Sequence, residues 1–478
     1  MEDQDIRNIE WGNDSAERDP DLLNYFVTPQ NFNRITNFKK TFVVGRKGAG
    51  KTAIRKKLIN DFSKQRDHIV VEVSPTNGIF RNLSGVELLK EDRSDESIFQ
   101  YAWLKSIMRK CLNTIGSIKE GKLTVGSAST ARAFAKSEGV YNEDFVESVT
   151  SILQSVKMKL GNSAELGIQI ENLIRETSEI DSYEYHLKNL AIDKCKTTIL
   201  IDDLDIGWDN SERSNKILLG LLTAAMHMQA IHENVNVIIF IRDDIYSILL
   251  KKTTHSDKFR DVYKISWTES SLQSLLAERI SQSLSDTSST NESADFLRVF
   301  PERIGNQFTL GWMVERTLGR PRELLQLSRL YTESLVDNKP SDKALKEVEE
   351  EYSTWKKEDL CGEFVNQYPD LDRIFDFWRD KYFRTKYQID EDVLEERMLE
   401  ILSEVDNKNE WFLLLKDTLN TKGLAKILFD IGFFGDFIKG GDGGSKVNYF
   451  SDTSNPLLKE VQIHPCFRKA VGTVSRNR

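Results

Sequence analysis

Eight residues near the N-terminus have the types and the spacing that a phosphate-binding loop requires. They read Gly-Arg-Lys-Gly-Ala-Gly-Lys-Thr and match the pattern G-x-x-x-x-G-K-T. The glycines let the backbone curl so that its N–H groups point at one anion. Lys51 would reach the β- and γ-phosphates of a nucleotide, and the Thr52 hydroxyl would be a ligand of Mg²⁺. We expect the nucleotide to contact Gly45, Arg46, Lys47, Gly48, Ala49, Gly50, Lys51, Thr52 and Ala53.

The residues on either side of this loop place it between a strand and a helix. Residues 42–44 form a short apolar run before it. After it, apolar residues recur at the spacing of one buried helical face, at Ile54, Leu58, Ile59 and Phe62. The positive end of this helix, which we expect to begin at about Gly50, would also face the anion. This order favours a phosphate site over a chance match, but it does not identify the base of the nucleotide.

A second apolar run, residues 197–201, ends in two acids, Asp202 and Asp203. A strand that ends in adjacent carboxylates has the form of a Walker B element. Asp202 would hold Mg²⁺ through water, and Asp203 would orient or deprotonate the water that attacks the γ-phosphate. With Lys51, Asp203 is thus a candidate catalytic residue. The alternative is a strand that ends in a solvated acidic turn, and the upstream loop argues against it.

Three arginines are candidates for contact with the γ-phosphate. Arg242 follows a third apolar strand, and in P-loop enzymes a polar residue at that tip usually lies near this phosphate; we therefore add it to the catalytic candidates. Its alternative is an ion pair with Asp243 or Asp244. Arg320 and Arg322 flank a helix start in the sequence Gly-Arg-Pro-Arg-Glu-Leu. From a lid they would sense the γ-phosphate, and otherwise they mark a basic helix start on the surface.

The first half of the chain predicts an α/β fold. Five short apolar runs alternate with helical patterns, at residues 42–44, 68–73, 197–201, 235–241 and 262–267. Such runs with helical connections predict a parallel sheet covered on both faces. We therefore expect a five-stranded parallel P-loop NTPase core at 38–268 with a helical insertion at about 80–190, in which residues 116–137 form a loop. Right-handed crossovers would put the nucleotide at the carboxyl ends of the strands.

The remaining segments divide into an arm and two further parts. Residues 1–37 begin with a polar, acidic stretch and are expected to be a loosely packed N-terminal arm. Residues 269–360 read as a helical lid. Residues 361–478 are expected to form a helical plus winged-helix-like α+β domain, because a helix at 423–434 runs into a turn and strand-like runs follow at 447–450 and 460–464. From residue 439 onward this end holds seven basic and three acidic residues, which suits phosphate contacts or a protein-docking wing.

Composition excludes several classes of protein. The net charge of −9 argues against wholesale coating of nucleic acid, although a local basic patch is compatible with it. No apolar run approaches the length of a membrane span, and the acidic N-terminus has no apolar signal segment, so we expect a cytoplasmic protein without a membrane partner. The four cysteines form no C-x-x-C pair, and none of the six histidines pairs with them at zinc spacing.

Four motifs together resemble the STAND and KAP-like P-loop NTPases of bacteria, and more distantly the origin-recognition initiators of the AAA+ group. They are GRKGAGKT at 45–52, ILIDDLD at 199–205, IFIRDD at 239–244 and GRPREL at 319–324. The resemblance covers roughly residues 38–360 and implies ATP and Mg²⁺ as cofactors, slow turnover, and frequently a role in bacterial defence or stress. Two features depart from it. The catalytic acid of AAA+ proteins is typically Glu, whereas here Asp203 takes that position, and the long insertion has no assigned counterpart.

These observations lead to one main hypothesis and two alternatives. The main hypothesis is an ATP-binding and hydrolysing regulatory ATPase that acts as a nucleotide-controlled switch, with a separate effector or sensor chain as partner and possible homo-oligomers. One alternative is a DNA-binding initiator or repair ATPase whose winged helix contacts duplex DNA. The other is a scaffold that holds ATP without hydrolysing it.

Overall fold

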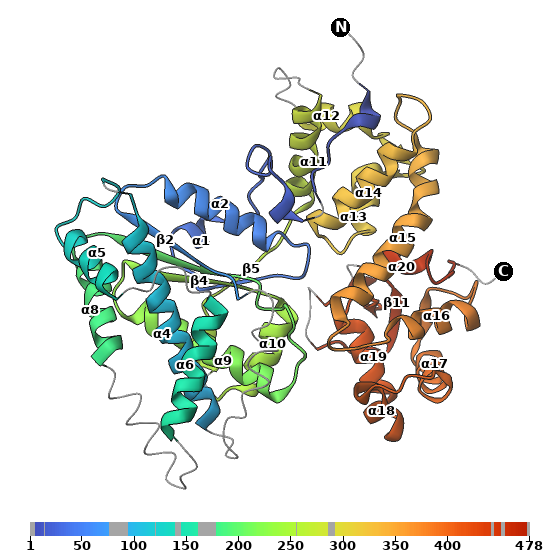
Figure 1. Cartoon of the computed structure of the whole chain (residues 1–478). Coiled ribbons are helices and arrows are strands. Elements are labelled where there is room, and N and C mark those ends of the chain that lie inside the picture. The colour runs from blue at the N-terminus through green and yellow to red at the C-terminus, as the bar shows by residue number, and fades with distance from the viewer. Residues whose placement is uncertain are drawn as a thin grey trace. The chain divides into compact units, whose positions relative to one another are not determined.

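The computed structural model describes residues 5–13, 15–75, 94–119, 121–138, 145–160, 178–254, 256–284, 292–440, 444–450 and 455–475. The chain divides into two compact units (Figure 1). The first, Thr28–Ser266, is called the P-loop unit below. The second combines Met1–Val27 with Trp267–Arg478 and is called the C-terminal unit. Each unit has its own apolar core.

Five parallel strands form the centre of the P-loop unit. They are β1 (Phe42–Val44), β2 (His68–Val73), β3 (Lys196–Ile201), β4 (Val235–Ile241) and β5 (Val262–Lys264). Their order across the sheet is β2-β3-β4-β1-β5, so one strand separates the strand before the loop from the strand before the acidic pair. Every neighbouring pair is parallel. The expected α/β class with a five-stranded parallel sheet is thereby confirmed.

Helices cover both faces of this sheet, with α2 on one face and α9 on the other (Figure 1). The helices of the unit are α1 (Asn33–Thr36), α2 (Lys51–Ser63), α4 (Ser94–Ser117), α5 (Ala128–Ser137), α6 (Phe145–Leu160), α8 (Ser178–Ile192), α9 (Glu212–Ala230) and α10 (Asp243–Lys252). Helices α4 and α9 approach each other closely. A Cβ atom added at Gly220 of α9 would lie 2.7 Å from the Cβ atom of Phe99, so this contact requires glycine.

Part of the insertion that we expected as a loop is helical. Residues 128–137 form α5, and its alanines Ala128, Ala131 and Ala135 are buried. Alanine is the best helix former, and small side chains let a short helix pack closely on its neighbours. The sequence prediction was wrong here because a segment of Ala, Ser and Lys has little apolar signal, although its alanines follow a helical spacing.

The first half of the C-terminal unit is mainly helical. Its elements are α11 (Glu269–Ser283), α12 (Glu292–Val299), the short hairpin β6 (Arg303–Ile304) and β7 (Gln307–Phe308), α13 (Thr309–Glu315), α14 (Pro321–Ser334), α15 (Asp342–Phe364) and α16 (Asp372–Lys381). The expected boundary between residues 360 and 361 falls inside α15. None of the helices in the described residues combines the length and the apolar character that crossing a bilayer requires.

In the second half of this unit, three helices lie between the first strand of an antiparallel sheet and its other three strands. Its elements are β8 (Gln388–Asp390), α17 (Glu391–Glu404), α18 (Glu410–Asp417), α19 (Thr421–Asp430), β9 (Phe434–Ile438), β10 (Lys446–Asn448), β11 (Glu460–Ile463) and α20 (Pro465–Arg468). The sheet order is β10-β9-β11-β8. The two strand-like runs do not pair with each other, because each pairs with β9. We had assigned the beginning of β9 to a helix and its turn, but Gly432, with φ 96°, follows the end of α19 and the buried Phe434 starts a strand.

The N-terminal segment is packed into the core of the C-terminal unit rather than forming a loose arm. Ile6, Ile9 and Trp11 are buried there. The indole Nε1 of Trp11 donates to Thr332 Oγ1 at 2.9 Å, and Arg329 Nη2 donates to the carbonyl oxygen of Gly12 at 2.7 Å. Because α14 supplies both partners, the segment is part of this unit's fold.

We predict that Trp11→Ala lowers the free energy of unfolding of the C-terminal unit by about 3 kcal/mol, since truncating a buried tryptophan removes its packing and leaves a cavity. Hydrogen exchange of the α14 amides, measured in parallel with urea unfolding, reports this change. Val336→Ala is the matched control, because Val336 is 87% exposed. Equal exchange rates in the two variants would show that the segment does not stabilise the unit.

Candidate nucleotide-binding site

The loop between β1 and α2 has the backbone conformation that an anion site needs. Gly48 and Gly50 adopt left-handed φ angles of 79° and 100°, which favour glycine. A Cβ atom added at Gly45 would lie 3.1 Å from Ile265 Cδ1 and 3.2 Å from Ala49 Cβ. Helix α2 begins at Lys51 with Gly50 as its N-cap, and glycine has no side chain to accept from the first N–H groups of the helix. These donors therefore suit a phosphate.

The side chain of Lys51 folds back over this loop. Its Nζ atom donates to the carbonyl oxygen of Gly45 at 2.9 Å and to that of Arg46 at 3.1 Å. The ammonium group is thus held beside the curled backbone and carries the positive charge that a polyphosphate would meet there. A contact of Lys51 with the β- and γ-phosphates stays a prediction.

The two predicted metal ligands come together at the carboxyl end of β3. The Oγ1 atom of Thr52 lies 3.4 Å from Asp202 Oδ2, although 150 residues separate them in the chain. Asp202 is 3% exposed. Burial, followed by the negative charge of Asp203, raises the pKa of Asp202 to about 7, while the positive charges of Arg55 and Lys51 act in the opposite direction. A cation at this position would therefore stabilise the ionised carboxylate.

The donor atoms fit a magnesium ion that a nucleotide brings with it. A hydroxyl and a carboxylate are hard oxygen ligands, which Mg²⁺ prefers, and this ion usually takes its other ligands from phosphates and water. In the part of the chain that the structure describes, no three His, Cys, Asp or Glu side chains gather as a metal site. Thr52 and Asp202 are thus suited to share Mg²⁺ with a nucleotide rather than to hold it alone.

Asp203 has an unusual backbone conformation directly after β3. Its φ angle is 61°, in the left-handed region that aspartate and asparagine enter more readily than most residues. Strained backbone of this kind often occurs at functional sites, where the surrounding structure maintains it. Asp203 lies at the same sheet edge as Asp202, where the water-orienting acid is expected, and that role stays a prediction.

Arg242 is buried and paired. Its Nε atom donates to Asp244 Oδ1 at 3.0 Å, and its Nη2 atom donates to Asp244 Oδ2 at 2.7 Å. A second pair joins the loop to the same helix start, because Arg46 Nε lies 2.7 Å from Asp243 Oδ1. The ion-pair alternative that we considered for Arg242 is therefore present, but in the interior rather than on the surface. A contact with the γ-phosphate remains a prediction for this side chain.

Arg320, which is buried, and Arg322, which is partly exposed, belong to one charge cluster of the C-terminal unit. Arg320 is the N-cap of α14, and its Nη1 atom lies 3.1 Å from Glu363 Oε2. Arg322 Nη1 lies 3.1 Å from Asp359 Oδ1. Fully buried Lys356 places its Nζ atom 2.8 Å from Glu323 Oε1. These pairs tie α14 to α15 and compete with any phosphate for both guanidinium groups; the phosphate-sensing role is untested.

Two residues that sequence reasoning missed are Arg55 and Lys356. Arg55 follows Lys51 by four residues, so both project from neighbouring turns of α2, and its Nε atom lies 3.2 Å from Asp202 Oδ2. Lys356, Asp359 and Glu363 recur on α15 at the spacing of one helical face, a signal that could have indicated a shared partner. Their partners on α14 are visible only in the folded chain.

Two family models match separate segments of the chain. Residues 14–206 match the family described as ORC-CDC6-like, and residues 270–361 match the FunZ-associated C-terminal helical domain. The first match includes the phosphate-binding loop and the acidic pair, and it supports a nucleotide-binding P-loop ATPase.

The chain is also similar to one protein sequence and to two solved structures. The chain is 22% identical over 475 residues to the "Putative transposon gamma-delta 80.3 kDa protein" of Escherichia coli (strain K12); the match covers 96% of this chain and 66% of that protein. The ORC1 protein of Aeropyrum pernix, solved in complex with DNA, is 12% identical with a TM-score of 0.37, covering 93% of this chain and 92% of its own. Cdc6p of Pyrobaculum aerophilum is 13% identical with a TM-score of 0.29, covering 92% of each chain.

We predict that Lys51→Ala weakens ATP binding about 100-fold, because it removes a charged hydrogen-bond donor from the phosphates. Isothermal calorimetry with ATP and Mg²⁺ measures the change. Lys64→Ala is the control, since Lys64 is exposed and lies just beyond the other end of the same helix. An ATP affinity that is the same in both variants would contradict the assignment of the loop.

Proposed function

We propose that this chain is an ATP-binding and ATP-hydrolysing regulatory protein that acts as a nucleotide-controlled switch. The observation that carries the proposal is the meeting of Thr52 with buried Asp202 at 3.4 Å, beside the loop that holds Lys51. The end of the parallel sheet thus brings together a hydroxyl, a carboxylate and an ammonium group. This arrangement suits a nucleoside triphosphate with its metal ion.

Each residue then has a separate part in the chemistry. The loop N–H groups and Lys51 bind the β- and γ-phosphates and stabilise the charge that develops on them. Thr52 and Asp202 would hold Mg²⁺, which neutralises phosphate charge when bound. Asp203 orients the attacking water or accepts its proton. Because aspartate is one methylene shorter than glutamate, we expect slow hydrolysis, or hydrolysis that a partner's arginine accelerates.

The connections between the units support a switch. The chain passes between them twice, after Val27 and after Ser266. On the P-loop side the two connections are joined, because Gln30 N donates to the carbonyl oxygen of Ser266 at 3.3 Å and Tyr263 Oη donates to that of Gln30 at 2.5 Å. Tyr263 belongs to β5, which pairs with β1 next to the loop. A nucleotide that favours one conformation of the loop can therefore act on both connections.

The biological setting of the switch is a further part of the proposal. The STAND and KAP-like subtype, and a role in bacterial defence or stress with a separate effector or sensor chain, rest on the four sequence motifs. The chain spans 66% of the length of its Escherichia coli relative, which is described only as a transposon protein. A test of the defence or stress role therefore has to include the separate effector or sensor chain.

We predict that Asp203→Asn keeps ATP bound but slows hydrolysis about 100-fold, because it removes the group that activates water. Asparagine tolerates the left-handed backbone at this position, so the fold is expected to persist. Phosphate release and calorimetry measure the two effects. The trapped ATP complex is then compared with the ADP complex by hydrogen exchange across residues 300–478.

The outcomes separate the parts of this proposal. Wild-type turnover in Asp203→Asn would contradict the role of Asp203, and tight ATP binding without turnover in the wild type would support the scaffold alternative. Identical exchange with ATP and with ADP would contradict the switch. If the profiles differ, Arg322→Ala, and as second choice Arg320→Ala, should reduce the difference while leaving ATP binding largely intact.

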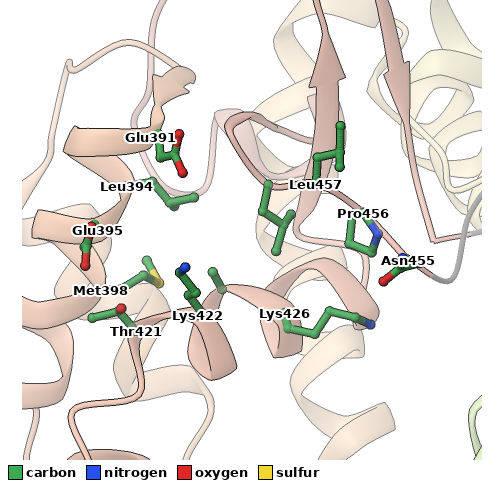
Figure 2. Close-up of a pocket in the computed structure, with 12 residues that line it drawn as sticks. Glu391, Leu394, Glu395, Met398, Thr421, Lys422, Lys426, Asn455, Pro456 and Leu457 are labelled. Atoms are coloured by element: carbon green, nitrogen blue, oxygen red, sulfur yellow. The ribbon is translucent and has the colours of Figure 1, made fainter.

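The C-terminal module offers a surface for a partner. Three residues join α18 to α19, and the hairpin of β9 and β10 follows, an arrangement that supports a winged-helix-like module. A pocket of about 260 Å³ lies beside α19. Figure 2 shows Glu391 and Glu395 along one side and Leu457 on the other, with Lys422 projecting from α19.

The chemistry of this pocket favours a protein partner over duplex DNA. Buried Leu394, Met398 and Ala425 contribute an apolar lining, and Glu391 and Glu395 are exposed at its side. The carboxylates of Glu391 and Glu395 repel the phosphates of a duplex and offset the charges of Lys422 and Lys426, which also line the pocket. An apolar side chain of a protein can enter such a pocket. We therefore favour protein docking here, with duplex binding as the alternative.

We predict that the full chain binds duplex DNA only weakly, with a dissociation constant no tighter than about 10⁻⁶ M at physiological salt. Fluorescence anisotropy over a salt series measures this affinity. The variant Lys422→Glu is compared with Lys408→Glu, an exposed lysine outside α19. Tight binding with a steep salt dependence that only Lys422→Glu reduces would favour the DNA alternative.

A further inference from the structure

Arg55 occupies the position from which a side chain can control access to Asp202. Thr52 and Arg55 lie three residues apart on α2, so both face the end of β3. Asp202 Oδ2 lies 3.4 Å from Thr52 Oγ1 and 3.2 Å from Arg55 Nε. The oxygen that would serve a magnesium ion thus already has a cation beside it. Among the ion pairs within the described residues, this is the one that includes Asp202.

The guanidinium group of Arg55 also has partners at the end of β2. Its Nη1 atom donates to Ser74 Oγ at 3.0 Å and lies 3.6 Å from Glu72 Oε2. The side chain of Arg55 is 12% exposed and that of Asp202 is 4% exposed, whereas that of Glu72 is 51% exposed. Arg55 therefore lies within ion-pair distance of a buried carboxylate and of a more solvated one, and a small rotation would bring it closer to one and further from the other.

The contact with Asp202 is electrostatic rather than directional. The Arg55 Nε atom is buried, and it has no aligned hydrogen-bond acceptor in the part of the chain that the structure describes. The aligned hydrogen bond of the group goes to Ser74 instead. Because the guanidinium is anchored at Ser74, it can leave Asp202 without losing that bond.

Resting on the proposed function, we propose that Arg55 is a positioning residue that sets the magnesium requirement of the site. It neutralises Asp202 while no metal is present, and Mg²⁺ has to displace it toward Glu72. Arginine is always charged in proteins, so Mg²⁺ meets this competing cation whenever Asp202 is ionised. In a water-like dielectric, a unit positive charge a few ångströms from a divalent cation lowers the affinity of the site for that cation about tenfold.

The proposal predicts effects of opposite sign from two neighbouring side chains. Arg55→Gln should increase the Mn²⁺ affinity of the ADP complex about tenfold, and it should also make the nucleotide-free protein less stable. Arg55→Lys, which keeps the charge, should restore most of the wild-type affinity. Glu72→Gln removes the alternative partner, so it should weaken Mn²⁺ binding. General structural damage would weaken binding in every variant and cannot produce the increase.

The experiment titrates Mn²⁺ into the full chain with bound ADP and measures free Mn²⁺ by electron paramagnetic resonance. Lys57→Gln is the matched control, because Lys57 is on the same helix and pairs with Asp61. An increase for Arg55→Gln and a decrease for Glu72→Gln support the proposal. Unchanged or weaker Mn²⁺ binding in Arg55→Gln overturns it while the proposed function stands. Failure of the wild type to bind either nucleotide overturns both.

Discussion

The P-loop unit depends on how it keeps two adjacent carboxylates at the end of one buried strand. Asp202 and Asp203 repel each other, and the sheet removes Asp202 from water. A buried charge needs a partner, or it takes up a proton. Arg55 and Lys51 supply positive charge from α2, and the parallel order of the strands brings that helix to the same edge as β3. The geometry that suits a metal-bound nucleotide thus also gives the buried carboxylate nearby positive charges.

The C-terminal unit also buries a charge and pairs it with its own side chains. Lys356 is fully buried, and its charge is matched by Glu323 and Asp359. Removing one member of such a cluster leaves an uncompensated charge, which typically costs about 3–5 kcal/mol. These pairs fix α14 against α15 in one register. The Gly-Arg-Pro-Arg-Glu-Leu motif accordingly has a clear structural use, whatever else its arginines contact.

The sequence allowed the parts of the fold that depend on local pattern to be predicted. The five apolar runs, the loop glycines and the acids after Ile201 each carry a signal within a few residues. What could not be predicted depends on distant partners. In the sequence, Arg55 is an ordinary residue of a helix. Its contacts exist only because the fold brings α2 to the ends of β2 and β3. The helix-and-turn interpretation of 423–434 extended one residue into strand β9 because Phe433 and Phe434 continue an apolar run, and Trp11 gave no sign that its partner is Thr332.

The position of Trp11 has a consequence for the order in which the molecule is made. Its hydrogen-bond partner Thr332 lies 321 residues further along the chain, beyond the whole P-loop unit. At about 5–20 residues per second, a ribosome needs roughly 15–60 s to synthesise that stretch. During this time the P-loop unit can fold. Ile6, Ile9 and Trp11 remain exposed to solvent, because the rest of the core in which they pack has not yet been synthesised. The N-terminal segment therefore gains its packing partners only after α14 has been synthesised, and a truncated product that ends before α14 would lack them.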